Sequence, residues 1–320
     1  YYQSNWARYG DTTDDLLSIG QHTGLASQVA SLGVSHAVLM IGANDFNSVG
    51  LDAYFNIYNG FWSSSQISTY VSSRVANVRA VLDTVAPTGA RLVLVNILDF
   101  GITPITWGSP FYSDASKRDR VTAVIQQVNA GLLGLAQEHH IVMVDAFALA
   151  RAAWGTNQNP RTTLLLGNVP IQLRQYDTST NTNPTAAFVH DRTHPHTTMQ
   201  GVLANVIIEA LNEGYGAALA PFTEQEILER VAVEDVKDVQ RLAHDLEVKP
   251  EVSRPEPVQR LLTPAEMAQR LARVGQVGRF QVADRIDGVE LGQLVEPVEL
   301  VHGLVRKGHL VHGESPPSLR

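Results

Sequence analysis

The sequence predicts an α/β fold in which helices are layered against a parallel β-sheet. Three short runs, 34–41 (VSHAVLMI), 91–97 (RLVLVNI) and 141–144 (IVMV), are almost continuously apolar and rich in Val, Leu and Ile, which is typical of strands buried on both faces. Helical patterns at 67–85 and 115–139 separate these runs. Strands that alternate with helices favour parallel pairing, because each crossover helix returns the chain to the same end of the sheet.

Two further helices are expected before the sequence changes character. Residues 197–200 (TTMQ) fit a capping box, in which the first and fourth side chains satisfy the free amides at a helix start. The apolar positions that follow have helical spacing: Val202, Leu203, Val206, Ile207 and Leu211. A second helical pattern ends the segment at 221–228.

Composition divides the chain into a domain at 1–230 and a tail at 231–320. The tail holds 26 of the 56 charged residues but only one aromatic residue, Phe280, so it offers little from which to build a core. Its patterns suggest a linker at 249–257, a helix beginning near residue 263 and short strands within 280–312. No chemistry-bearing motif is recognisable in the tail, and its structure and role stay open.

Charge and composition exclude several classes of partner. The net charge of −8 argues against nucleic acid, which is bound through clustered Lys and Arg. No apolar window approaches the 18 or so residues that span a bilayer. Cysteine is absent, which removes disulfides and thiolate chemistry. Residues 1–230 are rich in Asn, Ser, Thr and Gly and contain one lysine, Lys117, a composition that leans towards a secreted or periplasmic protein. The sequence does not specify an oligomeric state.

The heptad 190–196 (HDRTHPH) concentrates groups that can carry chemistry. Three histidines and an aspartate suit zinc, but their spacing has no helical metal-binding pattern and Pro195 interrupts it. A solvated polar loop is a second interpretation. The third is a base with its orienting carboxylate: Asp191 lies three residues before His194, close enough to accept from Nδ1–H and leave Nε2 free for a proton.

Asn44 and Asp45 directly follow the first apolar run. In a parallel α/β sheet, ligands bind beyond the carboxyl ends of the strands, so these two residues are candidates for a site. A plain turn is the competing interpretation, because Asn and Asp tolerate left-handed backbone and bond to their own main chain.

Taken together, three blocks resemble the SGNH hydrolases, also called the GDSL esterase/lipase family. They are SNWARYGDTT at 4–13, GAND at 42–45 and DRTHP at 191–195, in the family's order over about 200 residues. The resemblance covers residues 1–230 and implies a three-layer α/β/α fold with a flavodoxin-like sheet. It also implies that His194 is the general base, that Asp191 orients it, and that the Asn44 side chain and the Gly10 backbone N–H donate to the oxyanion.

The family's first block, a strand ending in Gly-Asp-Ser that carries the nucleophile, is not found in this sequence. We expect the chain to begin after that strand, and therefore to be poorly stable and inactive by itself. Weaker substitutes are Thr12 in Gly-Asp-Thr, Ser4, and Ser315 after a C-terminal apolar run.

The leading hypothesis is a serine esterase or lipase acting through an acyl-enzyme on a small-molecule, lipid or carbohydrate ester, with no cofactor or metal. The alternatives are a non-catalytic module that keeps the fold and binds an ester or carbohydrate, and a metal-dependent hydrolase. The aromatic stretch 54–62 (YFNIYNGFW) would either line an acyl site or pack beneath a loop.

Overall fold

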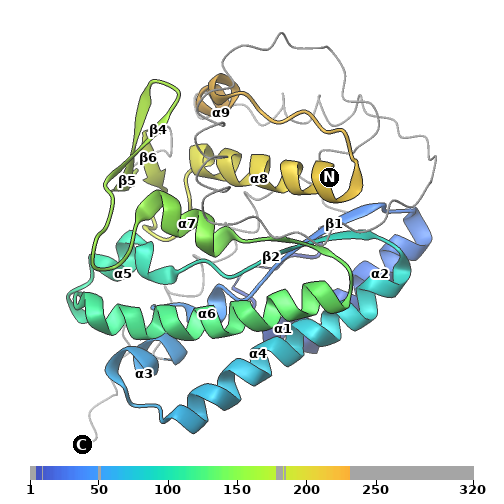
Figure 1. Ribbon diagram of the computed structural model, residues 1–320, viewed down its shortest axis with the longest axis horizontal. Helices are drawn as coiled ribbons and strands as arrows, with labels where there is room; N and C mark the ends of the chain where they lie inside the picture. Colours follow the sequence, from blue (N-terminus) through green and yellow to red (C-terminus); the bar gives the residue numbers. More distant parts are fainter. Residues whose placement is uncertain (1–4, 9, 50–51, 178–182, 184, 231–320) are drawn as a thin grey trace, which may run out of the picture.

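The computed structural model describes residues 5–8, 10–49, 52–177, 183 and 185–230, which form an α/β structure (Figure 1). The α-helices are α1 (Thr13–Ser18), α2 (Gln21–Leu32), α3 (Ala53–Asn59), α4 (Ser64–Val85), α5 (Pro104–Trp107), α6 (Ala115–Glu138), α7 (Ala146–Trp154), α8 (Thr197–Tyr215) and α9 (Glu224–Arg230). Short 3-10 helices are η1 (Asn44–Phe46), η2 (Ala86–Thr88), η3 (Phe100–Ile102) and η4 (Pro110–Tyr112). The strands are β1 (His36–Met40), β2 (Arg91–Val95), β3 (Val142–Val144), β4 (Thr163–Leu166), β5 (Val169–Tyr176) and β6 (Ala186–Phe188).

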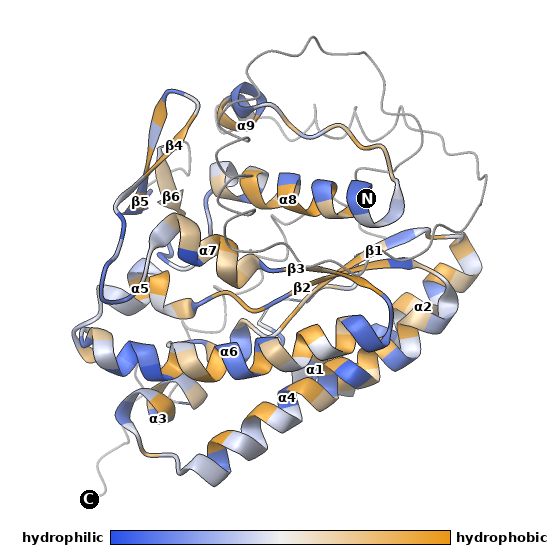
Figure 2. Cartoon of the chain, viewed as in Figure 1, coloured by the Kyte–Doolittle hydropathy of each residue, from blue (hydrophilic) through white to orange (hydrophobic). Residues whose placement is uncertain are grey.

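The three apolar runs form one parallel sheet in the order β1-β2-β3, so the predicted α/β class with a parallel sheet is confirmed. Residues alternate between its two faces, as strand geometry requires. Leu92 and Leu94 pack into a core beneath α4 and α6, whereas Val93 and Val95 pack against α8. Figure 1 shows α4 and α6 on one side of the sheet and α8 on the other, and Figure 2 shows the apolar colouring of the strands between them.

Strand β1 lies at an edge of this sheet and is less buried than β2. It pairs with β2 along one edge, and the described residues place no strand along its other edge. Four of its five residues are only half-buried, while four of the five in β2 are buried. Unpaired backbone at a sheet edge can accept another strand, and this edge ends beside Asn44.

A second sheet, β4-β5-β6, was not predicted from the sequence. Strands β4 and β5 form an antiparallel hairpin, and β6 pairs with β5 in parallel. Ile171 and Leu173 of β5 are fully buried in a separate core with α7 and the start of α8. The sheet matters for the site because β6 leads directly into the 190–196 heptad.

Two helix starts differ from the sequence prediction. Helix α4 begins at Ser64, three residues early, because Ser63 and Gln66 form a reciprocal capping box. The capping box predicted at 197–200 is wrong: His196 occupies the N-cap position and its side chain does not cap the helix, while the Gln200 amide donates to the Pro195 carbonyl.

The tail at 231–320, with its expected linker, helix and short strands, lies outside the described residues. Within the described ranges, no helix is both long enough and apolar enough to cross a membrane.

Candidate functional site

The loop that carries His194, residues 189–196, is folded back on itself between β6 and α8. Val189 N donates to the His194 carbonyl at 3.0 Å, and Arg192 N donates to the Val189 carbonyl at 2.9 Å. Arg192 adopts a left-handed φ of 66° at the turn, and His196 N ties the loop end to the Ala187 carbonyl of β6 at 2.8 Å. The loop conformation is therefore fixed by its own backbone and by the second sheet.

Asp191 and His194 form a direct pair within this loop. His194 Nδ1 contacts Asp191 Oδ2, while the other oxygen, Oδ1, accepts from Thr193 N at 2.8 Å and His194 N at 2.9 Å. Burial would raise the pKa of the Asp191 carboxyl, but hydrogen bonds from His194 and Thr193 outweigh it and lower the pKa below its ordinary value. Asp191 is therefore a carboxylate at neutral pH.

The far nitrogen of the His194 ring is left without a partner. His194 is only 4% exposed, and within the described ranges Nε2 is buried with no hydrogen-bond partner. A carboxylate on Nδ1 fixes the tautomer in which Nε2 carries the lone pair. The pair can thus accept a proton at Nε2 from a hydroxyl group that approaches it.

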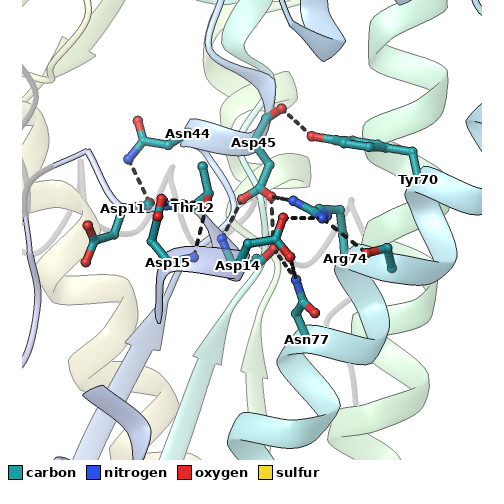
Figure 3. A network of polar contacts seen from close by, with 11 residues as sticks. Asp11, Thr12, Asp14, Asp15, Asn44, Asp45, Tyr70, Arg74 and Asn77 are labelled. Atoms are coloured by element: carbon teal, nitrogen blue, oxygen red, sulfur yellow. Dashed lines mark hydrogen bonds and ion pairs between the residues drawn. The ribbon is translucent and has the colours of Figure 1, made fainter. Parts of the chain in front are cut away.

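Asn44 and the segment after Gly10 are held together at the carboxyl end of β1 (Figure 3). The Asn44 side chain donates through Nδ2 to the Asp11 carbonyl at 3.0 Å, and its Oδ1 is buried without a partner in the described part of the chain. Gly10 adopts a left-handed φ of 73°, which glycine tolerates without strain. The structure therefore brings the two predicted oxyanion donors into adjoining segments.

Asp45 joins the segment after β1 to the segment after Gly10. Its side chain is fully buried and accepts from Thr13 N at 3.0 Å, Thr13 Oγ1 at 2.9 Å and Arg74 Nη1 at 2.5 Å. Arg74 also pairs with the exposed Asp14, and the Tyr70 hydroxyl donates to the Asp45 carbonyl (Figure 3). Burial raises the pKa of the Asp45 carboxyl, and the Arg74 and Thr13 hydrogen bonds oppose that rise. The simple-turn interpretation of residues 44–45 is incomplete, since Asp45 bonds to distant residues.

The short helix α5 connects this region to the His194 loop. Thr106 Oγ1 lies 2.6 Å from Ser48 Oγ, just after η1, and Ile105 N donates to the Arg192 carbonyl at 3.0 Å. Within the described ranges, no hydrogen bond joins Asn44 or Gly10 to His194. The predicted site residues thus form two groups that are linked through α5.

The other histidines of the heptad differ from His194. His190 is exposed, whereas His196 is fully buried and its Nε2 lies 3.8 Å from Asp177 Oδ2 at the end of β5. The sequence does not reveal this second pair, because nothing local marks Asp177 as the partner of His196. Across the described ranges, no three His, Asp or Glu side chains gather where they could hold a metal ion.

The substitute nucleophile Thr12 is engaged elsewhere. Its hydroxyl caps α1, donating to Asp15 Oδ2 at 2.7 Å and accepting from Asp15 N. Ser4 and Ser315 lie outside the described residues.

The aromatic stretch at 54–62 contributes mainly to packing. Tyr54 and Tyr58 are buried in the core beneath the sheet and contact the Tyr112 ring, while Phe61 is exposed. The interpretation as packing therefore describes the two tyrosines.

Comparison of the chain with protein-family models, with curated proteins and with solved structures finds no match in any of the three. The case for a function therefore depends on the geometry of the described residues.

Proposed function

We propose that this chain contributes the base, the orienting carboxylate and the oxyanion donors of a serine-type ester hydrolase. The observation that carries the proposal is the Asp191–His194 pair, with Asp191 on Nδ1 and a buried, unpartnered Nε2. A buried nitrogen acceptor without a hydrogen bond is costly, and a substrate-side or nucleophile hydroxyl would satisfy it. The resemblance of three sequence blocks to the SGNH hydrolases supports the same assignment.

The proposed reaction follows from these groups. A serine hydroxyl gives its proton to His194 Nε2 as its oxygen adds to the ester carbonyl. The resulting oxyanion accepts from Gly10 N–H and from the second amide hydrogen of Asn44, since Asn44 spends only one of its two on the Asp11 carbonyl. Each such donor contributes about 3 kcal/mol in comparable acyl-transfer sites. His194 then protonates the departing alcohol, and water hydrolyses the acyl-enzyme with His194 again as base.

The nucleophile has to come from outside the described residues, because none of their hydroxyls bonds to His194 Nε2. The unpaired edge of β1 suggests a route. A strand added there in parallel would end at the same edge of the sheet as Asn44, where sites of this architecture lie. The described three-stranded sheet would then be part of a larger, flavodoxin-like one.

The test is active-site labelling with a fluorophosphonate, which reacts with activated serine. The protein should be expressed together with any coding sequence that precedes Tyr1 in frame. We expect labelling of the wild type and of His190→Ala, a control in the same loop, and at least a hundredfold slower labelling of His194→Ala. Labelling that does not depend on His194, or no labelling of the wild type, would refute the proposal.

One competing function is a non-catalytic module that binds an ester or carbohydrate, which is favoured by the finding that no hydroxyl of the described residues bonds to Nε2. Calorimetry distinguishes the two, because a module would bind an ester without releasing its acid. Release of acid that disappears in His194→Ala would exclude the module.

A further inference from the structure

One face of β5, beside the His194 loop, carries positive charge and aromatic rings. Side chains alternate along a strand. The buried Ile171 and Leu173 therefore share one face of β5, and Arg174 and Tyr176 share the other. Helix α5 packs against β5 (Figure 1), where its Trp107 ring meets Arg174. The face therefore lies next to the helix that is bonded to the His194 loop.

Two aromatic rings at this face, Tyr176 of β5 and Trp107 of α5, each lie against an arginine guanidinium group. Arg174 Cζ lies 4.8 Å from the centre of the Trp107 ring of α5, and Arg192 Cζ lies 5.6 Å from the centre of the Tyr176 ring. Arg192 is two residues from His194, in the same loop. Two arginines are thus held in place by stacking, one on β5 and one beside the proposed base.

Neither arginine is neutralised by an acid. In the described part of the chain, no carboxylate pairs with the Arg174 or Arg192 guanidinium. Arg174 is half-buried, and burial together with the charge of Arg118 lowers its pKa. Arg118 itself is buried and donates to neutral oxygens, the Asn157 amide and the Tyr112 carbonyl.

This arrangement is unusual for an acidic protein. The chain has 32 acidic residues against 24 basic ones, so carboxylates are available, yet none in the described ranges forms an ion pair with either arginine. A partly buried cation without a counter-charge costs free energy, as does the Trp107 Nε1–H, which is buried with no acceptor in the described ranges. Both costs are offset if an anion binds at this face.

We propose that Arg174 and Arg192 bind an anionic group, a carboxylate or phosphate, on the ester that the site hydrolyses. The guanidinium fork suits such a group because it donates two parallel hydrogen bonds to a pair of oxygens, and Trp107 Nε1–H lies beside Arg174 as a neutral donor. The substrate class is then an acidic ester rather than a neutral lipid. The position of the ester bond rests on the proposed function, whereas the anion site itself does not.

The anion site is tested by titration with inorganic phosphate and, separately, with acetate, at constant ionic strength held with sodium chloride. The readout is the indole N–H resonance of Trp107 in a ¹⁵N-labelled sample, assigned by its loss in Trp107→Phe. We expect a saturable shift, at least tenfold weaker in Arg174→Gln and unchanged in Arg79→Gln, a control that removes an equal charge at an exposed ion pair with Glu138. The stronger of the two anions identifies the group as phosphate or carboxylate.

Arg174→Lys separates a binding role from a structural one, because it keeps the charge but loses the fork. It should keep the fold and bind more weakly than wild type. No saturable shift with either anion, or equal shifts in Arg174→Gln and Arg79→Gln, would overturn the proposal.

A second readout tests the substrate class in unlabelled protein that hydrolyses an ester. The ratio of kcat/KM for a carboxylate-bearing ester to that for its neutral methyl ester should fall at least tenfold in Arg174→Gln and stay constant in Arg79→Gln. If no ester is hydrolysed, the proposed function fails while the phosphate and acetate titrations still decide the anion site.

Discussion

Replacing Asp45 with asparagine tests whether the buried network in Figure 3 supports the site. The change keeps the shape of the side chain but turns one acceptor oxygen into a donor. Oδ1 accepts from Arg74 and Thr13 Oγ1, and Oδ2 accepts from Thr13 N. An amide that keeps its oxygen towards Arg74 presents its NH₂ to the Thr13 N–H, so two donors then face each other.

The magnitude follows from these contacts. An unsatisfied buried N–H costs about 1–3 kcal/mol and a lost charge-assisted bond about 1.5–3 kcal/mol. Removing one member of a buried ion pair costs about 3–5 kcal/mol, and the lower end applies because Arg74 keeps Asp14 and the Ser73 hydroxyl. We expect Asp45→Asn to lower the free energy of unfolding by about 3 kcal/mol.

The same arginine supplies a matched control. Asp14 also lies 2.5 Å from Arg74, but its side chain is 60% exposed, so Asp14→Asn should cost under about 1 kcal/mol. Urea unfolding followed by circular dichroism at pH 7 compares the two variants, with equal sodium sulfate added if Asp45→Asn starts to unfold without urea. Costs that agree within 1 kcal/mol would refute the argument, because burial would then make no difference.

Three further predictions concern pH and backbone. Burial and the charge of Arg91 lower the pKa of His36 from 6.5 to about 4, so as the pH falls the unfolded chain is protonated at His36 before the folded one. The free energy of unfolding should therefore fall by about 3 kcal/mol between pH 6.5 and pH 4. Urea unfolding of His36→Phe across that range should not show this loss. Gly42 has a φ of 103°, and an added Cβ would lie 2.6 Å from the Ile97 side chain. Gly42→Ala should therefore lower the free energy of unfolding by about 2 kcal/mol or more. Gly134 lies in open space within α6, so thermal melting should show Gly134→Ala to be neutral or stabilising. Folding lowers the pKa of Asp191, so its ionised carboxylate stabilises the fold above the unfolded-state pKa, and this stabilisation is lost as the pH falls through the folded-state pKa. The free energies of unfolding of wild type and Asp191→Asn should therefore converge below about pH 4. A difference that stays constant with pH would contradict this explanation.

The sequence predicted the central sheet because its signal is local. Strands covered on both faces must be apolar at every position, and the run containing Leu92 and Val93 satisfies that requirement with two different cores. The second sheet escaped prediction because β5 has only Val169, Ile171 and Leu173 packed into its core, with Pro170 and polar residues around them. Such a short alternation does not distinguish a strand from a loop.

The contacts of the site differ in the same way: the local pair could be predicted from the sequence, and the distant contacts could not. Asp191 and His194 are three residues apart, so their pairing could be predicted from spacing and is observed. The partners of Asp45 are 29 and 32 residues away, and a buried arginine in α4 has no signature in a single sequence. The proposed roles of Asn44 and His194 remain predictions, since no hydrogen bond within the described ranges joins them.

Helix α5 gives the separate parts of the site a common support. Its Thr106 bonds to Ser48 beyond η1, its Ile105 to the Arg192 carbonyl, and its Trp107 stacks on Arg174 of β5. A four-residue helix is too short to be stable alone, so these contacts hold it in place as much as it holds them. An anion that draws Arg174 and Trp107 together therefore acts on the same helix that positions the backbone two residues before His194. If both proposals hold, recognition of an acidic group and placement of the base are linked through α5, and Arg174 belongs to the proposed site even though none of the three sequence blocks contains it.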